Sequence, residues 1–434
     1  MSSTSLARRT AAVMATGALA LTLGVTPATA ATPATAATAA AAAPTVPAVP
    51  APAGPTATAA AGLLTDLVAL FSEHVYLSGE VVTAGLTAGT NSPLYAAAVT
   101  ALEDNNHSLA AAITSGSQDP TAYYQALTAT GKAEAVLSLD FASGRPSDAT
   151  LAKHAAEVEQ GDLSLAKLGV QSLQGVTLDQ LMLAHKTLST TIVQAGSALT
   201  SGAKDAFVLT ELAAVRSSDQ ASAYAAGIAA KKGLTGVDSR AAVLRAALTL
   251  LFVGHVYQTG ILTHTALLKG PRSPQARAAS LAEDANSQAL AKSIEQLFGS
   301  AAGGQFLADW RAHIGGYKTF VMAKVSRNAT QRARAIKGLN GYVGDAAAQF
   351  HGLLPNLGTT KLTQDLSTHI AGTEKQIDLQ AAMSVGQFAN ARAGAKHFAD
   401  VAATLAATIV AKKGITGTVT PAAASRLVAG FSRS

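Results

Sequence analysis

The chain has 434 residues, and its composition excludes several classes of protein. Charged residues make up 13%, and the formal net charge of +6 falls to about +4 without Arg8 and Arg9. A nucleic-acid-binding protein usually has a basic stripe with interleaved aromatic residues, whereas the lysines here are scattered, so we expect no nucleic-acid partner. The absence of cysteine excludes disulfides and thiolate chemistry.

Residues 1–31 are predicted to form a secretory signal peptide. Arg8 and Arg9 precede an apolar stretch that is short for a membrane span, and Ala28-Thr29-Ala30 has the pattern of a cleavage site. The general secretory route is favoured over twin-arginine export because no aromatic-leucine pair follows the arginines. We expect a secreted, extracytoplasmic protein, released or associated with the cell wall, without a transmembrane span in its mature form.

The composition changes twice along the rest of the chain. Residues 32–60 are almost entirely Ala, Pro, Thr and Val, which predicts a disordered spacer because no periodic apolar face is available to bury. The following residues are numerous enough for two domains, predicted at 61–237 and 238–417, with a C-terminal tail at 418–434.

An internal repeat at one offset, 181 residues, is the most informative feature of the sequence. Four motifs of the first copy recur in the second at this spacing. They are Leu70 to Tyr76 with Leu251 to Tyr257, Ser92-Pro93 with Ser273-Pro274, Asn105 to Ile113 with Asn286 to Ile294, and Lys231 to Gly236 with Lys412 to Gly417. The sequence therefore predicts a tandem duplication.

Helix signals accompany the repeated motifs. Ser-Pro predicts a serine N-cap with proline at the first helical position, and Lys-Lys-Gly predicts a basic last turn before a glycine stop. Apolar residues between these signals follow helical spacing and never alternate over a strand length. The predicted helices of the first copy span 62–87, 93–115, 120–141, 147–173, 177–202 and 204–232. Since the second copy follows the same plan over 239–413, the predicted fold is all-α, a tandem duplication of an antiparallel up-down bundle with about six helices per copy.

Candidate metal ligands come from the predicted helices of the second copy. They are His255, His313, His369, His397, Asp309 and Asp400. Neutral imidazoles from separate helices of a bundle can converge on a transition metal, here Fe, Cu, Zn or Mn. Each aspartate lies within one helical turn of a histidine and could act as a ligand or orient the imidazole.

The alternative is that these histidines are interior side chains that only pack and form hydrogen bonds. The first copy retains His74 and His185 as counterparts of His255 and His369, but Arg216 stands near the position of His397 and no partner matches His313. If the four histidines form a site, only the second copy has it. The matching His-Val-Tyr motifs instead favour a packing role for His74 and His255.

The second copy also resembles a family of exported all-helical proteins from actinobacteria and some spore-forming bacteria. The motifs that carry the resemblance are His255-Val-Tyr257, the Asn286 segment, Leu307 to Ile314 with Trp310 and His313, and His369-Ile370. The family has no established activity, so the resemblance implies export and helical architecture and no reaction.

Two functions are consistent with these features. One is a helical protein that binds a transition metal or cofactor through the second copy. The other is a non-enzymatic cell-envelope module, in which the spacer presents two similar units to an envelope or protein partner. An enzyme of unknown reaction comes third, because the chain lacks a glycine-rich phosphate loop, a nucleophile elbow and a distinct acid-base pair.

Overall fold

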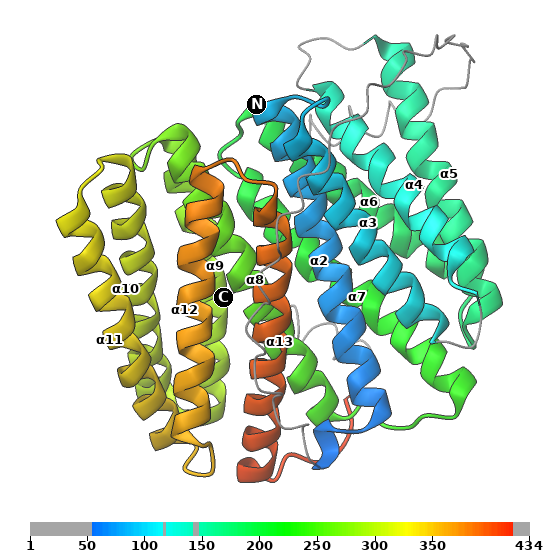
Figure 1. Cartoon of the computed structure of the whole chain (residues 1–434). Helices are drawn as coiled ribbons and strands as arrows, with labels where there is room; N and C mark the ends of the chain where they lie inside the picture. The colour runs from blue at the N-terminus through cyan, green and yellow to red at the C-terminus, as the bar shows by residue number, and fades with distance from the viewer. Residues whose placement is uncertain (1–53, 116–118, 142–146, 420–434) are drawn as a thin grey trace, which may run out of the picture.

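The computed structural model describes residues 54–115, 119–141 and 147–419, and in these residues the chain forms twelve α-helices and no β-strand (Figure 1). The predicted signal peptide and most of the predicted spacer and tail lie outside the described residues. A 3-10 helix, η1 (Gly54–Thr56), precedes the first α-helix. The α-helices are α2 (Ala59–Ala88), α3 (Pro93–Thr114), α4 (Thr121–Asp140), α5 (Asp148–Ser172), α6 (Leu178–Ser201), α7 (Ala206–Lys232), α8 (Arg240–Lys269), α9 (Pro274–Phe298), α10 (Ser300–Val325), α11 (Ala329–Leu353), α12 (Thr359–Ala381) and α13 (Gly386–Lys413).

The helix boundaries of the first half lie within three residues of those predicted, because the caps form as expected. Ser92 and Ser273 each accept a hydrogen bond from the backbone N–H three residues later, with a proline at the first position of the helix. At the other end, Gly233 and Gly414 adopt the left-handed conformation after paired lysines, where a residue with a side chain would be strained. The predicted all-α class is confirmed.

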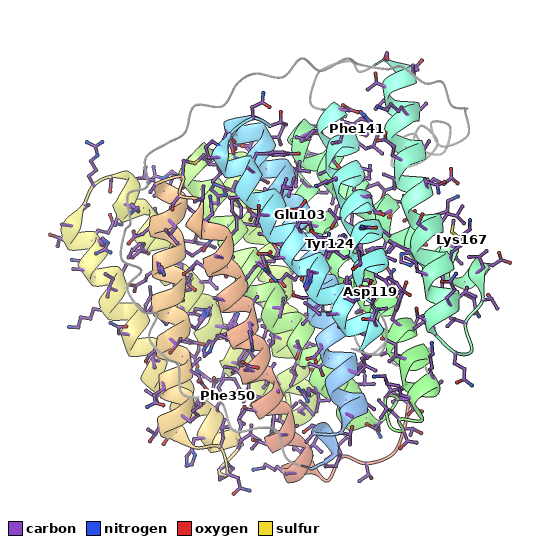
Figure 2. All side chains as sticks on the ribbon, turned by 45° about the vertical axis from the view of Figure 1, so that its right-hand side comes forward. Glu103, Asp119, Tyr124, Phe141, Lys167 and Phe350 are labelled. Carbon is purple, nitrogen blue, oxygen red and sulfur yellow. The ribbon has the colours of Figure 1, made fainter. Side chains whose placement is uncertain are left out.

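The two halves share one core instead of forming two separate bundles. In the centre α2 packs against α8, α7 packs on α2, and α13 packs on α8 (Figure 1). One large apolar cluster contains buried residues from α2 through α13, and a second, small cluster lies among α4, α5 and α6. Figure 2 turns the first half forward and shows exposed polar side chains such as Asp119 and Lys167 on its outer surface.

Two central helices are long and apolar enough to cross a membrane. In α2 and α8, 67% and 89% of the most apolar window is buried inside the protein. The same property is expected of helices that form the centre of a large bundle, since such helices are apolar all round.

A polar network joins the halves where α2 meets α8. The rings of Tyr76 and Tyr257 stack with centroids 4.9 Å apart and planes 6° apart. The hydroxyl of Tyr257 donates to Glu73 Oε1 over 2.8 Å, and Tyr76 donates to Glu211 Oε2 over 2.5 Å. A Cβ atom on Gly254, the residue 181 positions after Glu73, would lie 3.1 Å from the Tyr76 hydroxyl. The absence of a side chain at this position therefore leaves room for the Tyr76 contact.

The repeated asparagines link neighbouring helices. Asn105 Nδ2 donates to the Leu70 carbonyl over 3.1 Å, and Asn286 Nδ2 donates to the Leu251 carbonyl over 3.2 Å. Both bonds therefore connect the second helix of a half to its first. Asparagine is a poor helix former, so its presence in mid-helix is explained by this tertiary contact.

Candidate metal centre

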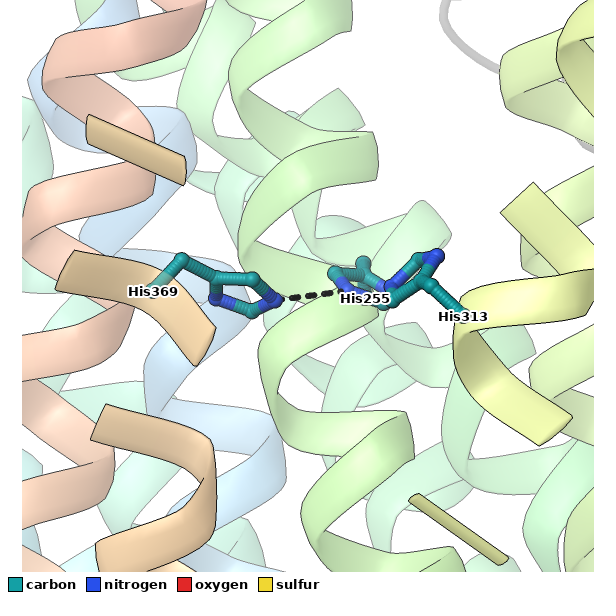
Figure 3. Close-up of side chains that lie close together, drawn as sticks. All are labelled: His255, His313 and His369. Carbon is teal, nitrogen blue, oxygen red and sulfur yellow. Dashed lines mark hydrogen bonds between the residues drawn. The ribbon is translucent and has the colours of Figure 1, made fainter. Parts of the chain in front are cut away.

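Three of the four predicted histidines meet in the core of the second half. His255 comes from α8, His313 from α10 and His369 from α12, as Figure 3 shows. One ring nitrogen of each lies within 4.8 Å of one from each of the others, and His255 Nε2 is 3.4 Å from His369 Nε2. We call these residues the histidine triad.

The spacing of the triad is close to that of a metal site. Three points within 4.8 Å of one another have a common point within about 2.8 Å of each, whereas a zinc–imidazole bond is about 2.0–2.1 Å long. Side-chain movements of less than about 1 Å would therefore bring the three nitrogens to bonding distance.

All three imidazoles are buried and held in the neutral form that can ligate a metal. Their exposed fractions are 0% for His255, 2% for His313 and 6% for His369. Burial lowers the pKa of His255 to about 3 and lowers the pKa of His313 and His369 well below the usual range. For His313 and His369, the proximity of His255 lowers the pKa further.

Glu283 of α9 lies beside Nδ1 of His255, the ring nitrogen that does not face His369. Its Oε1 is 3.6 Å from His255 Nδ1, and the Thr259 hydroxyl is 3.4 Å from the same nitrogen. Acceptors on this side favour a proton on Nδ1, which leaves the Nε2 lone pair directed at His369. Glu283 is buried, and it accepts a hydrogen bond from Ser287 over 2.9 Å. Burial raises the pKa of Glu283 to about 7.

His313 is the least constrained member of the triad. Neither of its ring nitrogens has a hydrogen-bond partner of good geometry, although the side chain is buried; the backbone of Trp310 contributes a weak hydrogen bond, which partly offsets the lowering of the His313 pKa by burial. A buried polar group without a partner costs about 1–3 kcal/mol, so its presence calls for an explanation. The ring of Tyr342 stacks on it at 4.5 Å. A metal ion would give the remaining nitrogen a partner of good geometry.

Aromatic rings enclose the triad. The Trp310 ring is 4.6 Å from His255 and 4.7 Å from His313, and the Phe398 ring is 4.1 Å from His369. Trp310 and Phe398 are fully buried. These rings exclude water and hold the imidazoles in place, so the triad lies in a low-dielectric environment.

The structure does not bring the other three predicted ligands to the triad. His397 Nε2 donates to the Asp365 carbonyl over 2.9 Å, and the next residue, Phe398, occupies the inward position because neighbouring helical residues point about 100° apart. Asp309 accepts from Gln305, and Asp400 pairs with Lys396 over 3.2 Å, both at the partly exposed surface. These two aspartates bond within their own helices.

The correspondence predicted for His185 is wrong. At the 181-residue offset His369 corresponds to Leu188, and His185 corresponds to Leu366 one turn earlier. His185 is buried in a contact of its own, where Gln220 Nε2 donates to Nδ1 over 2.7 Å and Nε2 is 2.9 Å from the Tyr224 hydroxyl. The first half therefore has no equivalent of the triad beyond His74.

His185 is expected to make the fold sensitive to acid. Burial lowers its pKa to about 3 from the usual 6.5, so the native state keeps the ring neutral. Its contribution to stability is complete above pH 6.5 and is lost as the pH falls towards 3, at up to about 1.4 kcal/mol per pH unit, because only the unfolded chain takes up the proton. His185→Gln should reduce the slope of the unfolding free energy against pH, measured in urea between pH 7 and 5, while the other buried histidines with lowered pKa maintain the remaining slope. His107→Gln, at an exposed position, should leave it unchanged, and equal slopes for both variants would contradict the assignment.

Comparisons with known proteins identify no relative. No family model, no curated protein and no solved structure matches the chain. The resemblance to the exported helical family therefore stays a prediction from the sequence, and the site has to be interpreted from its own geometry.

Proposed function

We propose that the protein binds one transition-metal ion through His255, His313 and His369. The observation that carries this proposal is the convergence of three buried, neutral imidazoles from three different helices, with ring nitrogens within 4.8 Å of one another. Burying three imidazoles together has a desolvation cost, and a shared ion would offset it.

The ligand set favours zinc or copper among the four metals predicted from the sequence. Imidazole suits both ions, whereas manganese prefers carboxylate and carbonyl oxygens. Glu283 would orient His255 and partly neutralise the charge of the ion from outside the coordination sphere. We propose metal binding without a reaction, since aromatic rings close the site to a substrate.

Metal titration of protein purified without a histidine tag tests the proposal. We expect the chelator-treated protein to bind one equivalent of Zn²⁺ or Cu²⁺, measured by calorimetry and by metal analysis. Free metal at about 100 times Kd should stabilise the fold by about 2.7 kcal/mol, seen as a rise in Tm. No bound metal, together with an unchanged Tm in the presence of zinc, copper, iron and manganese, would overturn the proposal.

Glu283→Gln provides a finer test. Removing the carboxylate should weaken binding about 10- to 100-fold with the same stoichiometry, because partners of ligating histidines orient them without bonding to the metal. Glu295→Gln is a matched control, since Glu295 lies on the same helix and pairs with Lys292 at the surface. Equal metal affinities for the two variants would show that Glu283 does not contribute to metal binding.

We further propose that the two halves arose by duplication of one up-down six-helix unit and that the protein is exported. The 181-residue offset supports the duplication, since Ala59 and Arg240, Pro93 and Pro274, and Asp148 and Ala329 begin helices at this spacing. The asparagine bonds to Leu70 and Leu251 recur at the same offset.

The basic and apolar N-terminal segment supports export, and an envelope partner would be reached through the Ala/Pro-rich spacer.

A further inference from the structure

Within the described residues, the histidine triad offers an ion three nitrogen ligands and no fourth ligand. His255, His313 and His369 form the one group of three or more histidine or acidic side chains there whose ligand atoms lie within 4.8 Å of one another. Glu283 lies beside Nδ1 of His255, the nitrogen turned away from His369, and is not a member of this group. Structural zinc sites are almost always tetrahedral with four ligands, so a zinc ion at the triad would lack one.

Aromatic rings occupy the space from which a water molecule could supply a fourth ligand. The ring centroids of Trp310, Tyr342 and Phe398 lie 4.6, 4.5 and 4.1 Å from the imidazole that each covers. A buried water molecule needs about two to four polar partners, and the faces of aromatic rings are poor ones. Tyr317 and Tyr342 carry hydroxyls near the triad, but burial raises the pKa of both, so they stay neutral phenols, which are weak ligands.

The charges around the triad favour a monovalent ion. Neutral imidazoles add no negative charge, so a divalent ion would keep both of its positive charges in a low-dielectric core. The Born cost of burying an ion rises with the square of its charge, so it is about four times larger for a divalent ion than for a monovalent ion of equal size. Glu283, 3.6 Å from His255, supplies one negative charge, whereas Asp365, one turn before His369, is paired with Lys361.

We propose that the histidine triad binds Cu⁺ in a three-coordinate site, in preference to Zn²⁺ and Cu²⁺. This inference rests on the proposed function, metal binding by the triad, and names the ion. Cu⁺ has a filled d shell, is stable with three nitrogen ligands and carries a single charge. Cu²⁺ prefers a square-planar or tetragonal arrangement of ligands, which three imidazoles enclosed by aromatic rings do not provide.

Phe398 stands where a fourth ligand could otherwise approach. Its ring centroid is 4.1 Å from that of His369 and 5.9 Å from that of His255, so the ring lies against two of the three ligands. Phe398 is 1% exposed and belongs to α13, a helix that contributes no member of the triad. An imidazole at this position would add a nitrogen from a fourth helix and complete a tetrahedral set. Phe398 is therefore the residue that sets the selectivity for a three-coordinate ion.

Anaerobic competition tests the preference for Cu⁺ in the full chain purified without a histidine tag. Cu⁺ is titrated against bicinchoninate, a chelator that colours on binding Cu⁺, and Zn²⁺ is titrated against a zinc-binding dye. We expect one equivalent of Cu⁺ to bind at least about tenfold more tightly than Zn²⁺ and to displace zinc from the zinc-loaded protein. X-ray absorption of the copper-loaded protein should show three nitrogen ligands, and EPR should show no Cu²⁺ signal.

Phe398→His tests the cause of the preference. The added imidazole should raise the Zn²⁺ affinity relative to the Cu⁺ affinity by about tenfold or more, because zinc then gains its tetrahedral set. Leu281→His is the matched control, since it adds a histidine at an exposed position of α9 and should leave the affinity ratio unchanged. Far-UV circular dichroism and Tm show whether each variant folds. If Phe398→His does not fold, the comparison of Cu⁺ with Zn²⁺ in the native protein decides.

The outcomes separate this inference from the proposed function. Zn²⁺ binding as tight as Cu⁺ binding, or a fourth ligand in the X-ray absorption data, would overturn the preference for Cu⁺ and leave metal binding by the triad intact. An unchanged affinity ratio in a folded Phe398→His variant would overturn the role of Phe398. Absence of binding for Cu⁺, Cu²⁺ and Zn²⁺, or Cu⁺ binding that persists unchanged in His313→Ala, would refute both the inference and the proposed function.

Discussion

His313→Ala is expected to reduce the zinc or copper affinity by more than the roughly 10- to 100-fold loss expected for Glu283→Gln. The variant leaves two imidazoles, and structural transition-metal sites need three or four protein ligands. His313 makes only a weak hydrogen bond with the backbone of Trp310, so its removal leaves at most one backbone group without that contact. The metal-free variant should therefore retain its fold, which separates loss of the ligand from loss of the structure. Calorimetric titration of the chelator-treated protein measures the effect.

His107→Ala is the control for this experiment. His107 is exposed on α3, so the same substitution there should leave the zinc and copper affinities unchanged. His397→Ala adds a second comparison, since His397 bonds to the Asp365 carbonyl and should change the affinity far less than His313→Ala. If His313→Ala bound metal as tightly as the native protein, the ligand assignment would be wrong.

Trp310→Ala is expected to have the largest effect on stability. Trp310 is 1% exposed, and its ring contacts Phe252, Phe306 and both His255 and His313. Truncation of a buried tryptophan leaves a cavity and costs about 3–5 kcal/mol, which is a large share of the stability of most domains. Urea unfolding followed by circular dichroism measures the loss. We also expect weaker metal binding, because the ring holds two ligands in place.

A matched apolar truncation tests whether this effect is specific to the core. Leu281 is 69% exposed on α9, so Leu281→Ala should change the unfolding free energy by no more than about 0.5 kcal/mol. Trp310→Phe should lie between the two, since it fills part of the cavity. A loss below about 1 kcal/mol for Trp310→Ala would mean that the aromatic enclosure is not packed as described.

The helices could be predicted from the sequence because their ends carry local signals. Ser92 and Ser273 cap as expected, and Gly233 and Gly414 end helices as expected. The shared core could not be predicted, since it depends on how α2 and α8 pack against each other and no local pattern encodes that contact. Both helices are apolar on all faces, and this feature of the sequence could have indicated their central position.

The candidate site could be predicted only in part. The mid-helix positions of four histidines predicted a shared site, but they could not show that His397 lies outside it, because the rotation of α13 places Phe398 inward instead. The sequence did not indicate that Glu283 belongs to the site. Glu283 precedes Asp284, and two adjacent acidic residues are typical of a solvent-exposed helix face. Glu283 lies three residues before Asn286, a spacing that places both on one helical face, so the repeated asparagine could have indicated its burial.

Crystallographic anomalous scattering tests the central claim most directly. Data from crystals of metal-loaded protein, collected on both sides of the zinc or copper absorption edge, locate the ion without reference to activity. We expect one strong peak about 2.0–2.1 Å from a ring nitrogen of each of His255, His313 and His369. Loaded crystals with no peak at the triad, or with the zinc or copper peak elsewhere, would contradict the account.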